Sequence, residues 1–215
     1  MLRVPKATLR KAGFLLAVTG SIVFCAPKQD STPLSAQDVH PLAVGNSVPN
    51  GILSTIDGKN VEFKKLITQK PSIVIFYRGG WCPYCNLQMG QLVAIEPELS
   101  KIGYQVLAIS PDKPQKLKES LGKHKINYTL LSDRSMEITR KFGLAYQVSP
   151  QILEGMQKHN VDLDSNTGNN LHMLPVPAAY VVDTKGLIHF VYFNADIKVR
   201  VNPDTLMNAA KRAKP

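Results

Sequence analysis

The chain is poor in cysteine and histidine, with three and five of them among 215 residues. One cysteine, Cys25, lies in an apolar N-terminal segment, so a small scaffold held together by several disulfides is excluded. The other two, Cys82 and Cys85, are two positions apart in the middle of the chain. No second cysteine pair or closely spaced histidine pair could complete a structural zinc site around them. We therefore interpret them as one functional pair, and expect no metal and no other cofactor.

Acidic residues are also few, with 16 Asp and Glu against 26 Lys and Arg. Of the formal net charge of +10, +4 belongs to residues 1–36. The remaining basic residues are scattered and are not interleaved with aromatic side chains, as they would be on a nucleic-acid platform. We interpret them as a solvated surface and expect no nucleic-acid partner.

Long apolar runs are lacking apart from one. Residues 12–26 carry no charge and follow a basic stretch. A membrane-spanning helix needs about 20 apolar residues, so residues 1–26 are typical of an export signal. We expect a periplasmic protein, or one attached to the outer face of the membrane by this segment. Cleavage after Ala36, lipidation of Cys25 and an uncleaved anchor are all open.

The pattern after the signal predicts a linker over residues 27–43 and one domain over residues 44–215. Residues 27–43 are polar and contain proline. An Asp-Gly pair between the apolar runs 52–56 and 61–63 predicts a β-hairpin. Alternating strands and helices then indicate an α/β fold, with a mixed central sheet between layers of helices. The predicted strands are 72–77, 104–110, 128–132, 178–182 and 187–193; the predicted helices are 83–100, 114–123, 133–142, 150–159 and 203–212, with a loop at 160–174.

The strongest functional signal is FYRGGWCPYC, residues 76–85. It follows a β-branched strand and precedes a helix that begins near Pro83, so Cys82 lies at the helix cap and Cys85 one turn in. A thiol at a helix start faces unpaired N–H groups and the positive end of the helix dipole, which both favour the reactive thiolate. The pattern predicts thiol redox chemistry.

From about Val44 to Ala210 the chain resembles the thioredoxin-fold superfamily, and more narrowly its peroxiredoxin-like alkyl hydroperoxide reductase/thiol-specific antioxidant branch. The resemblance rests on VGNSVPN, FYRGGWCPYC, FGLAY, LPVPAAYVVDTKG and NADIKVR. It implies a thioredoxin-like three-layer fold in which Cys82 and Cys85 cycle between dithiol and disulfide. It also implies a thioredoxin-like reducing protein as electron donor, and a hydroperoxide or a disulfide as substrate.

The resemblance leaves open which sulfur attacks first. Counting from Phe76 by the peroxiredoxin pattern makes Cys85 the peroxidatic cysteine, with Cys82 in place of a threonine and Arg78 in place of a proline. By the thioredoxin pattern, Pro177 is a cis-proline packed on the pair and Cys82 is the nucleophile. Because the strand arginine of peroxiredoxins is missing before residue 180, Arg78 is the nearest cation for a thiolate.

We expect a thiol-dependent peroxidase first, and a protein disulfide reductase as the alternative. Trp81 is expected to cover the site. A non-enzymatic copper-binding module, with His172 and His189 beside the cysteines, is the third interpretation. Asp196 and Arg200 are expected to form a structural ion pair.

Overall fold

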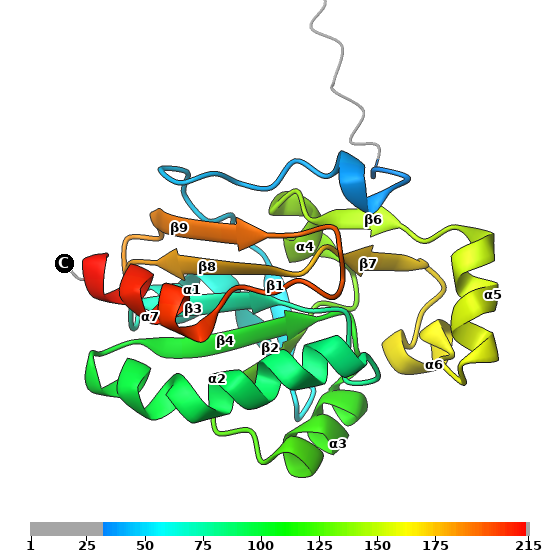
Figure 1. Ribbon diagram of the computed structural model, residues 1–215, viewed down its shortest axis with the longest axis horizontal. Helices are drawn as coiled ribbons and strands as arrows, with labels where there is room; N and C mark the ends of the chain where they lie inside the picture. Colours follow the sequence, from blue (N-terminus) through cyan, green and yellow to red (C-terminus); the bar gives the residue numbers. More distant parts are fainter. Residues whose placement is uncertain (1–31, 214–215) are drawn as a thin grey trace, which may run out of the picture. The chain divides into compact units, whose positions relative to one another are not determined.

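A computed structural model describes residues 32–213, so the predictions made for residues 1–26 and for Cys25 lie outside the described residues. Within residues 32–213 the main sheet has seven strands in the order β2-β1-β5-β4-β3-β8-β9 (Figure 1). The three central strands, β3, β4 and β5, are parallel to one another. The strands outside them pair antiparallel. The mixed sheet expected from the sequence is confirmed. The strands are β1 Ile52–Thr55, β2 Asn60–Glu62, β3 Ser72–Phe76, β4 Gln105–Ser110, β5 Thr129–Ser132, β8 Ala178–Val182 and β9 Ile188–Phe193.

Helices cover both faces of this sheet because its central strands are apolar on both sides. In β3, Ile73 and Ile75 belong to one buried cluster and Val74 and Phe76 to the other. This alternation follows from the two-residue period of a strand. The first cluster packs under α2 (Pro83–Lys101), α3 (Pro114–His124) and α7 (Pro203–Arg212). The second packs under α1 (Phe63–Ile67) and α4 (Glu137–Lys141).

A second, two-stranded sheet lies beside the main one, and its strand β7 begins inside the loop that the sequence predicted, whereas the helix predicted over residues 150–159 is confirmed. It pairs β6 (Ala145–Gln147) with β7 (Met173–Pro175), and α5 (Pro150–Lys158) and α6 (Leu163–Thr167) connect the two strands (Figure 1). The loop expected over residues 160–174 was therefore wrong in part. Asp162 caps α6 by accepting the backbone N–H of Ser165 at 3.0 Å, a signal that polar composition concealed.

The expected linker was also wrong in its described part. Residues 32–43 lie against the domain, with a short 3-10 helix η1 at Ala36–Asp38. Val39 belongs to the core, and the backbone N–H of Leu42 donates to the Phe142 carbonyl at 3.0 Å. Apolar residues between prolines explain the docking that composition did not predict.

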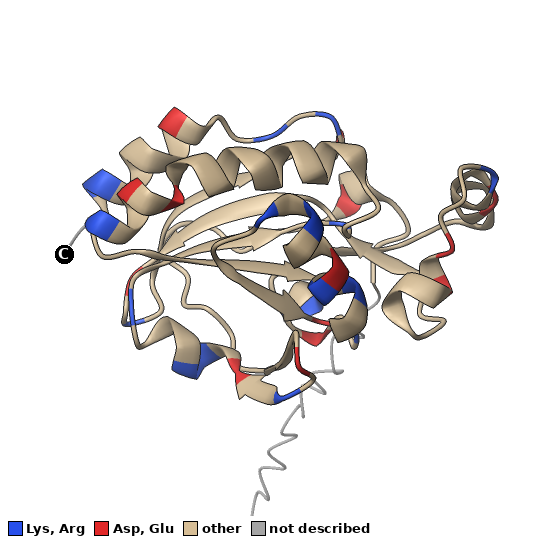
Figure 2. Ribbon diagram, turned by 90° about the horizontal axis from the view of Figure 1, so that it is seen from below, with Lys and Arg blue, Asp and Glu red and all other residues tan. Residues whose placement is uncertain are grey.

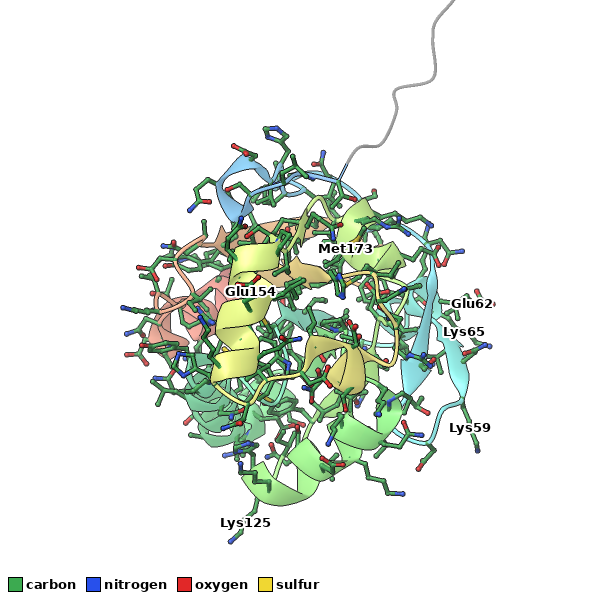
Figure 3. All side chains as sticks on the ribbon, turned by 90° about the vertical axis from the view of Figure 1, so that its right-hand side faces the viewer. Lys59, Glu62, Lys65, Lys125, Glu154 and Met173 are labelled. Atoms are coloured by element: carbon green, nitrogen blue, oxygen red, sulfur yellow. The ribbon has the colours of Figure 1, made fainter. Side chains whose placement is uncertain are left out.

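The basic residues are spread over several elements. Figure 2 shows blue and red positions interspersed along the helices, and Figure 3 shows Lys59 and Lys65 on one side of the view, with Glu62 beside them, and Lys125 away from them. No helix within residues 32–213 is long and apolar enough to cross a membrane.

Candidate redox site

The cysteine pair lies where β3 turns into α2. Cys82 is the N-cap of the helix, Pro83 is its first residue, and Cys85 lies one turn in on the buried face. Proline is well suited to this first position, because its missing N–H would have no partner there. The local structure therefore has the form that the sequence predicted.

Two glycines make the tight turn before Cys82 feasible. Gly79 has φ +149°, and a Cβ there would lie 2.3 Å from the Trp81 indole nitrogen. A Cβ on Gly80 would lie 2.0 Å from the Ser120 hydroxyl oxygen. At Gly79 the positive φ and the indole both disfavour a side chain, and at Gly80 a side chain would require the Ser120 hydroxyl to move, so both glycines allow Trp81 and Ser120 to lie close to the backbone.

The two sulfurs have opposite protonation tendencies. The Cys85 thiol donates a hydrogen bond that lowers the pKa of Cys82 to about 6, against the opposing effect of burial; the Cys85 backbone N–H and the Arg78 charge act in the same direction. The same hydrogen bond, together with burial, raises the pKa of Cys85 well above the ordinary thiol value. The reduced site therefore holds a Cys82 thiolate beside a Cys85 thiol.

Arg78 faces the Cys82 sulfur. Its Nη1 lies 4.0 Å from Cys82 Sγ, and its guanidinium carbon lies 4.9 Å from the centre of the Trp81 ring. Trp81 is half-buried, and Tyr146 on β6 also faces the guanidinium. Trp81 thus supports the arginine from below, in a cation–π arrangement, rather than only covering the site.

A second arginine reaches the pair from the far end of the sequence. Arg200, in the segment between β9 and α7, places Nη2 at 3.7 Å from Cys85 Sγ. The expected ion pair with Asp196 was wrong: Arg200 Nη1 instead donates to the Val199 carbonyl at 2.8 Å. The NADIKVR stretch was the available signal, but its spacing gave no indication that it would reach the cysteines.

Pro177 does not have the expected geometry, because no cis peptide bond occurs within residues 32–213. Pro177 is buried, and its carbonyl accepts the backbone N–H of Asn194 at 3.3 Å. Its position therefore fixes the start of the segment that carries Arg200.

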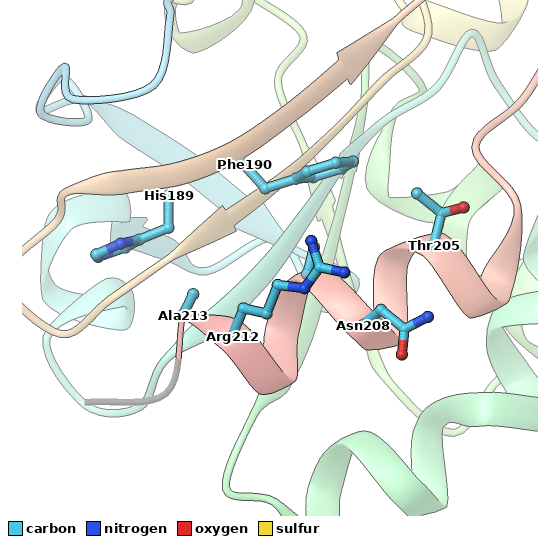
Figure 4. Close-up of a pocket in the computed structure, with 7 residues that line it drawn as sticks. His189, Phe190, Thr205, Asn208, Arg212 and Ala213 are labelled. Carbon is cyan, nitrogen blue, oxygen red and sulfur yellow. The ribbon is translucent and has the colours of Figure 1, made fainter.

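The histidines of the copper hypothesis pair with acids away from the cysteines. His172 binds Asp164 and His189 binds Asp183, each at 2.9 Å. In the part of the chain that the structure describes, no three His, Cys, Asp or Glu side chains are grouped to hold a metal ion. His189 also lines a 380 Å³ pocket between β9 and α7 with Phe190, Asn208 and Arg212 (Figure 4), and this pocket contains no cysteine.

The sequence profile of the AhpC/TSA family matches residues 44–191. The chain belongs to the AhpC/TSA family. It is 29% identical to peroxiredoxin Bcp of Escherichia coli K12 over 80% of this chain and 98% of that protein. It is 35% identical to a putative peroxiredoxin bcp of Haemophilus influenzae over 49% of this chain and 68% of that protein.

Solved structures show the same fold. Reduced Prx3 of Vibrio vulnificus in complex with H₂O₂ superposes with a TM-score of 0.64 at 16% identity, covering 79% of this chain and 98% of that one. Peroxidoxin BcpB of Mycobacterium tuberculosis gives 0.62 at 17%, covering 81% and 99%. The peroxiredoxin-like family and thioredoxin-like fold expected from the sequence are confirmed.

Proposed function

We propose that this thiol-dependent peroxidase reduces hydroperoxides through a dithiol–disulfide cycle in which Cys82 attacks and Cys85 resolves. The observation that carries the proposal is the position of Cys82 at the N-cap of α2 with Arg78 Nη1 4.0 Å from its sulfur, because both the helix start and the positive charge favour the Cys82 thiolate. Membership of the AhpC/TSA family and the peroxiredoxin relatives support the peroxidase. They do not assign the sulfurs.

The chemistry balances with these two residues. The Cys82 thiolate attacks the terminal peroxide oxygen, the O–O bond breaks, and the departing alkoxide takes a proton to leave as an alcohol. Cys82 is then a sulfenic acid. The Cys85 sulfur, as it loses its proton, attacks the sulfur of that acid, water leaves and the disulfide forms. Two electrons from a donor dithiol return both cysteines to the reduced state.

Cys85 is the poorer first nucleophile in this geometry. Both cysteines are buried, so exposure does not separate them, but the raised pKa keeps Cys85 protonated, whereas the thiolate is the attacking form. The count from Phe76 assigns the attack to Cys85, but Cys82 is the sulfur that is ionised. Resolution suits Cys85, because Arg200 stands at 3.7 Å to stabilise the charge as its proton leaves.

A protein disulfide exchanger is the second candidate, because a thiolate at a helix cap also attacks disulfides. Burial favours the peroxide. Cys82 is 1% exposed, so a small hydroperoxide reaches its sulfur with far less rearrangement than a protein disulfide needs. Reduction by a thioredoxin-like donor, which we propose as the electron source, then requires the turn to open after oxidation.

The test traps the sulfenic acid with dimedone after one equivalent of hydrogen peroxide. Cys85→Ser should lose turnover but carry the dimedone adduct on Cys82, and Cys82→Ser should react with peroxide at least about a hundredfold more slowly. Cys25→Ser is the control and should leave turnover unchanged. A fast first turnover and an adduct on Cys85 in Cys82→Ser would reverse the assignment. Faster reduction of a protein disulfide than of peroxide would favour the exchanger.

We also propose that the protein is exported, on the basis of the charge and length pattern of residues 1–26, which lie outside the described residues. Fractionation of cells that express the full chain, with and without residues 1–26, tests this. Recovery of both forms in the cytoplasm would contradict it.

A further inference from the structure

A buried carboxylate packs against the redox turn, the segment of residues 78–82 that connects β3 to α2. Asp112 follows β4, and its side chain is 1% exposed. Its Oδ2 accepts the backbone N–H of Gly80 at 2.7 Å, and its backbone carbonyl accepts the Ser132 hydroxyl at 2.6 Å. Its Oδ1 has no hydrogen-bond partner within the described residues. A buried oxygen without a partner is costly, so its position calls for a physical explanation.

The free oxygen lies against Trp81. A Cβ built on Gly79 would be 2.7 Å from Asp112 Oδ1 and 2.3 Å from Trp81 Nε1, so both atoms lie on the same side of this glycine and close to each other. The indole N–H likewise has no partner that meets hydrogen-bond geometry in this part of the chain. An indole N–H can only donate and a carboxylate can only accept, so the two groups are complementary in charge and position.

From Trp81 the contacts lead to the sulfur. The guanidinium of Arg78 lies 4.9 Å above the ring, and its Nη1 lies 4.0 Å from Cys82 Sγ. No carboxylate forms an ion pair with Arg78 among residues 32–213, so its charge is left for the sulfur. The arginine is held by Trp81 and Tyr146 instead.

We propose that Asp112 is a positioning residue for the Cys82 thiolate: its carboxylate fixes Gly80 and the Trp81 indole, and Trp81 in turn holds Arg78 over the sulfur. The inference rests on the proposed function only in taking Cys82 as the ionised cysteine. Asp112 itself does not touch the reacting atoms.

The groups that face Asp112 come from α3 and from the end of β3, besides the Gly80 and Trp81 contacts already described. Lys116 on α3 attracts its charge and Glu119 opposes it, while the Tyr77 hydroxyl lies on the β3 side. A 220 Å³ pocket beside Asp112 is lined by Asp112 and Trp81 together with Lys116, Glu119, Ser120 and Lys123. Burial raises the pKa of Asp112 to about 7, so the carboxylate is half-ionised near neutral pH. Above pH 7 the ionised carboxylate accepts more strongly from the Gly80 N–H and the Trp81 indole N–H.

Positioning and simple electrostatics predict opposite results for Asp112→Asn. Through-space repulsion alone would make removal of a negative charge stabilise the thiolate and lower the pKa of Cys82. In the positioning role the amide still accepts the Gly80 N–H, but its NH₂ group meets the indole N–H as a second donor. Trp81 and Arg78 then shift, and the pKa of Cys82 rises.

The experiment measures the rate of alkylation of Cys82 by iodoacetamide against pH, by mass spectrometry of the full chain in a Cys85→Ser background. We expect Asp112→Asn to slow alkylation about threefold near pH 7, where Asp112 is half-ionised, with a smaller difference at pH 6, where Asp112 is largely protonated, and none at pH 9. If the pH midpoint of Cys82 alkylation is unchanged or lower in Asp112→Asn, the proposal is overturned. Peroxide reduction is not measured, so failure of the peroxidase assignment would leave this result interpretable.

Two further variants guard against a purely structural effect. Asp133→Asn alters another buried carboxylate, one that accepts the Thr139 backbone N–H at 2.7 Å outside the turn, and it should not move the Cys82 midpoint. Trp81→Phe keeps a ring under Arg78 but removes the N–H. In that background Asp112→Asn should give no further rise. A full additional rise there, or a shift in Asp133→Asn equal to that in Asp112→Asn, would contradict action through Trp81.

Discussion

Two arginines face the redox pair, and they reach it by different means. Arg78 is four residues from Cys82, the sulfur that it contacts, and the glycine turn and the Trp81 ring hold it there. Arg200 is 115 residues from Cys85 and reaches it only through the complete fold. The first belongs to a local structure and the second to a tertiary one.

The two arginines also serve different protonation states. Arg78 helps lower the pKa of Cys82, which is ionised before any substrate arrives. The charge of Arg200 acts on both sulfurs, but it does not overcome the burial and hydrogen bond that keep Cys85 protonated. The comparison indicates that Arg78 supports attack, and that Arg200 supports the resolving step, when Cys85 loses its proton.

Gly79→Ala should have the largest effect, because it disrupts the glycine turn that holds Arg78 and Trp81 beside Cys82. The Cβ meets Trp81 Nε1 and Asp112 Oδ1, and φ of +149° is strained for alanine. We expect a loss of about 1–3 kcal/mol in the free energy of unfolding and loss of most peroxide reactivity. Chemical denaturation and peroxide consumption measure both.

Gly90→Ala is the matched control for that variant. Gly90 lies in α2 with nothing within 4 Å of a Cβ built on it, so alanine should be neutral or stabilising by up to about 1 kcal/mol. Equal losses in the two variants would show that the redox turn is no more constrained than an open helix position.

Arg78→Gln should come next in size, because it removes the charge that faces Cys82 and leaves the turn in place. We expect the rate of the peroxide reaction at pH 6 to fall about tenfold and to recover above pH 8, where the thiol ionises without help. Arg78→Lys keeps the charge but loses the planar stacking on Trp81, so its peroxide reaction rate at pH 6 should lie between those of the wild type and Arg78→Gln. Stopped-flow Trp81 fluorescence provides the measurement.

Arg200→Gln should have a smaller effect, and on a different step. The first reaction with peroxide should change little, while formation of the Cys82–Cys85 disulfide should slow by about threefold. Single-turnover quenching with dimedone separates the two steps. An Arg200→Gln defect confined to the first step would mean that the two arginines do not divide the reaction in this way.

The same division explains what could be predicted from the sequence. The cap position of Cys82, the buried face of Cys85 and the strand before them follow from local pattern, as do the sheet and the bounds of β8 and α7. Arg200 on Cys85 and Asp112 behind Trp81 depend on long-range packing, which spacing does not encode. Pro177 was misjudged because a fold-level analogy was carried onto a residue whose carbonyl anchors Asn194 in this chain.

The start of α4 shows the same limit. The sequence predicted a helix from Asp133, but α4 begins at Glu137, and Asp133 accepts the N–H groups of Ile138 and Thr139 from outside the helix. A buried carboxylate that binds the first turn from several residues upstream resembles an ordinary cap in composition. Only the tertiary position of the β5 end distinguishes the two.

The smallest effect is the difference between the Arg78→Gln and Arg200→Gln variants in how stability depends on pH. The pKa of Cys82 is lowered by folding, so the native state binds fewer protons at this thiol than the unfolded state does between about pH 6 and the ordinary thiol value near 9. Its contribution to stability is therefore present above the ordinary value and is lost as the pH falls toward 6.

Asp112 and Asp133, whose pKa values are raised, act with the opposite sign. Both carboxylates are common to wild type and Cys82→Ser, and the raised pKa of Cys85 keeps it protonated in the wild type up to the ordinary thiol value near 9, so below pH 9 the difference in their free energies of unfolding reports mainly on Cys82. That difference should grow in favour of the wild type from pH 6 to pH 9, and the growth should be smaller in an Arg78→Gln background than in an Arg200→Gln background. A difference that is flat with pH would mean that Cys82 is not ionised in the folded protein, and neither arginine could then have the role given to it here.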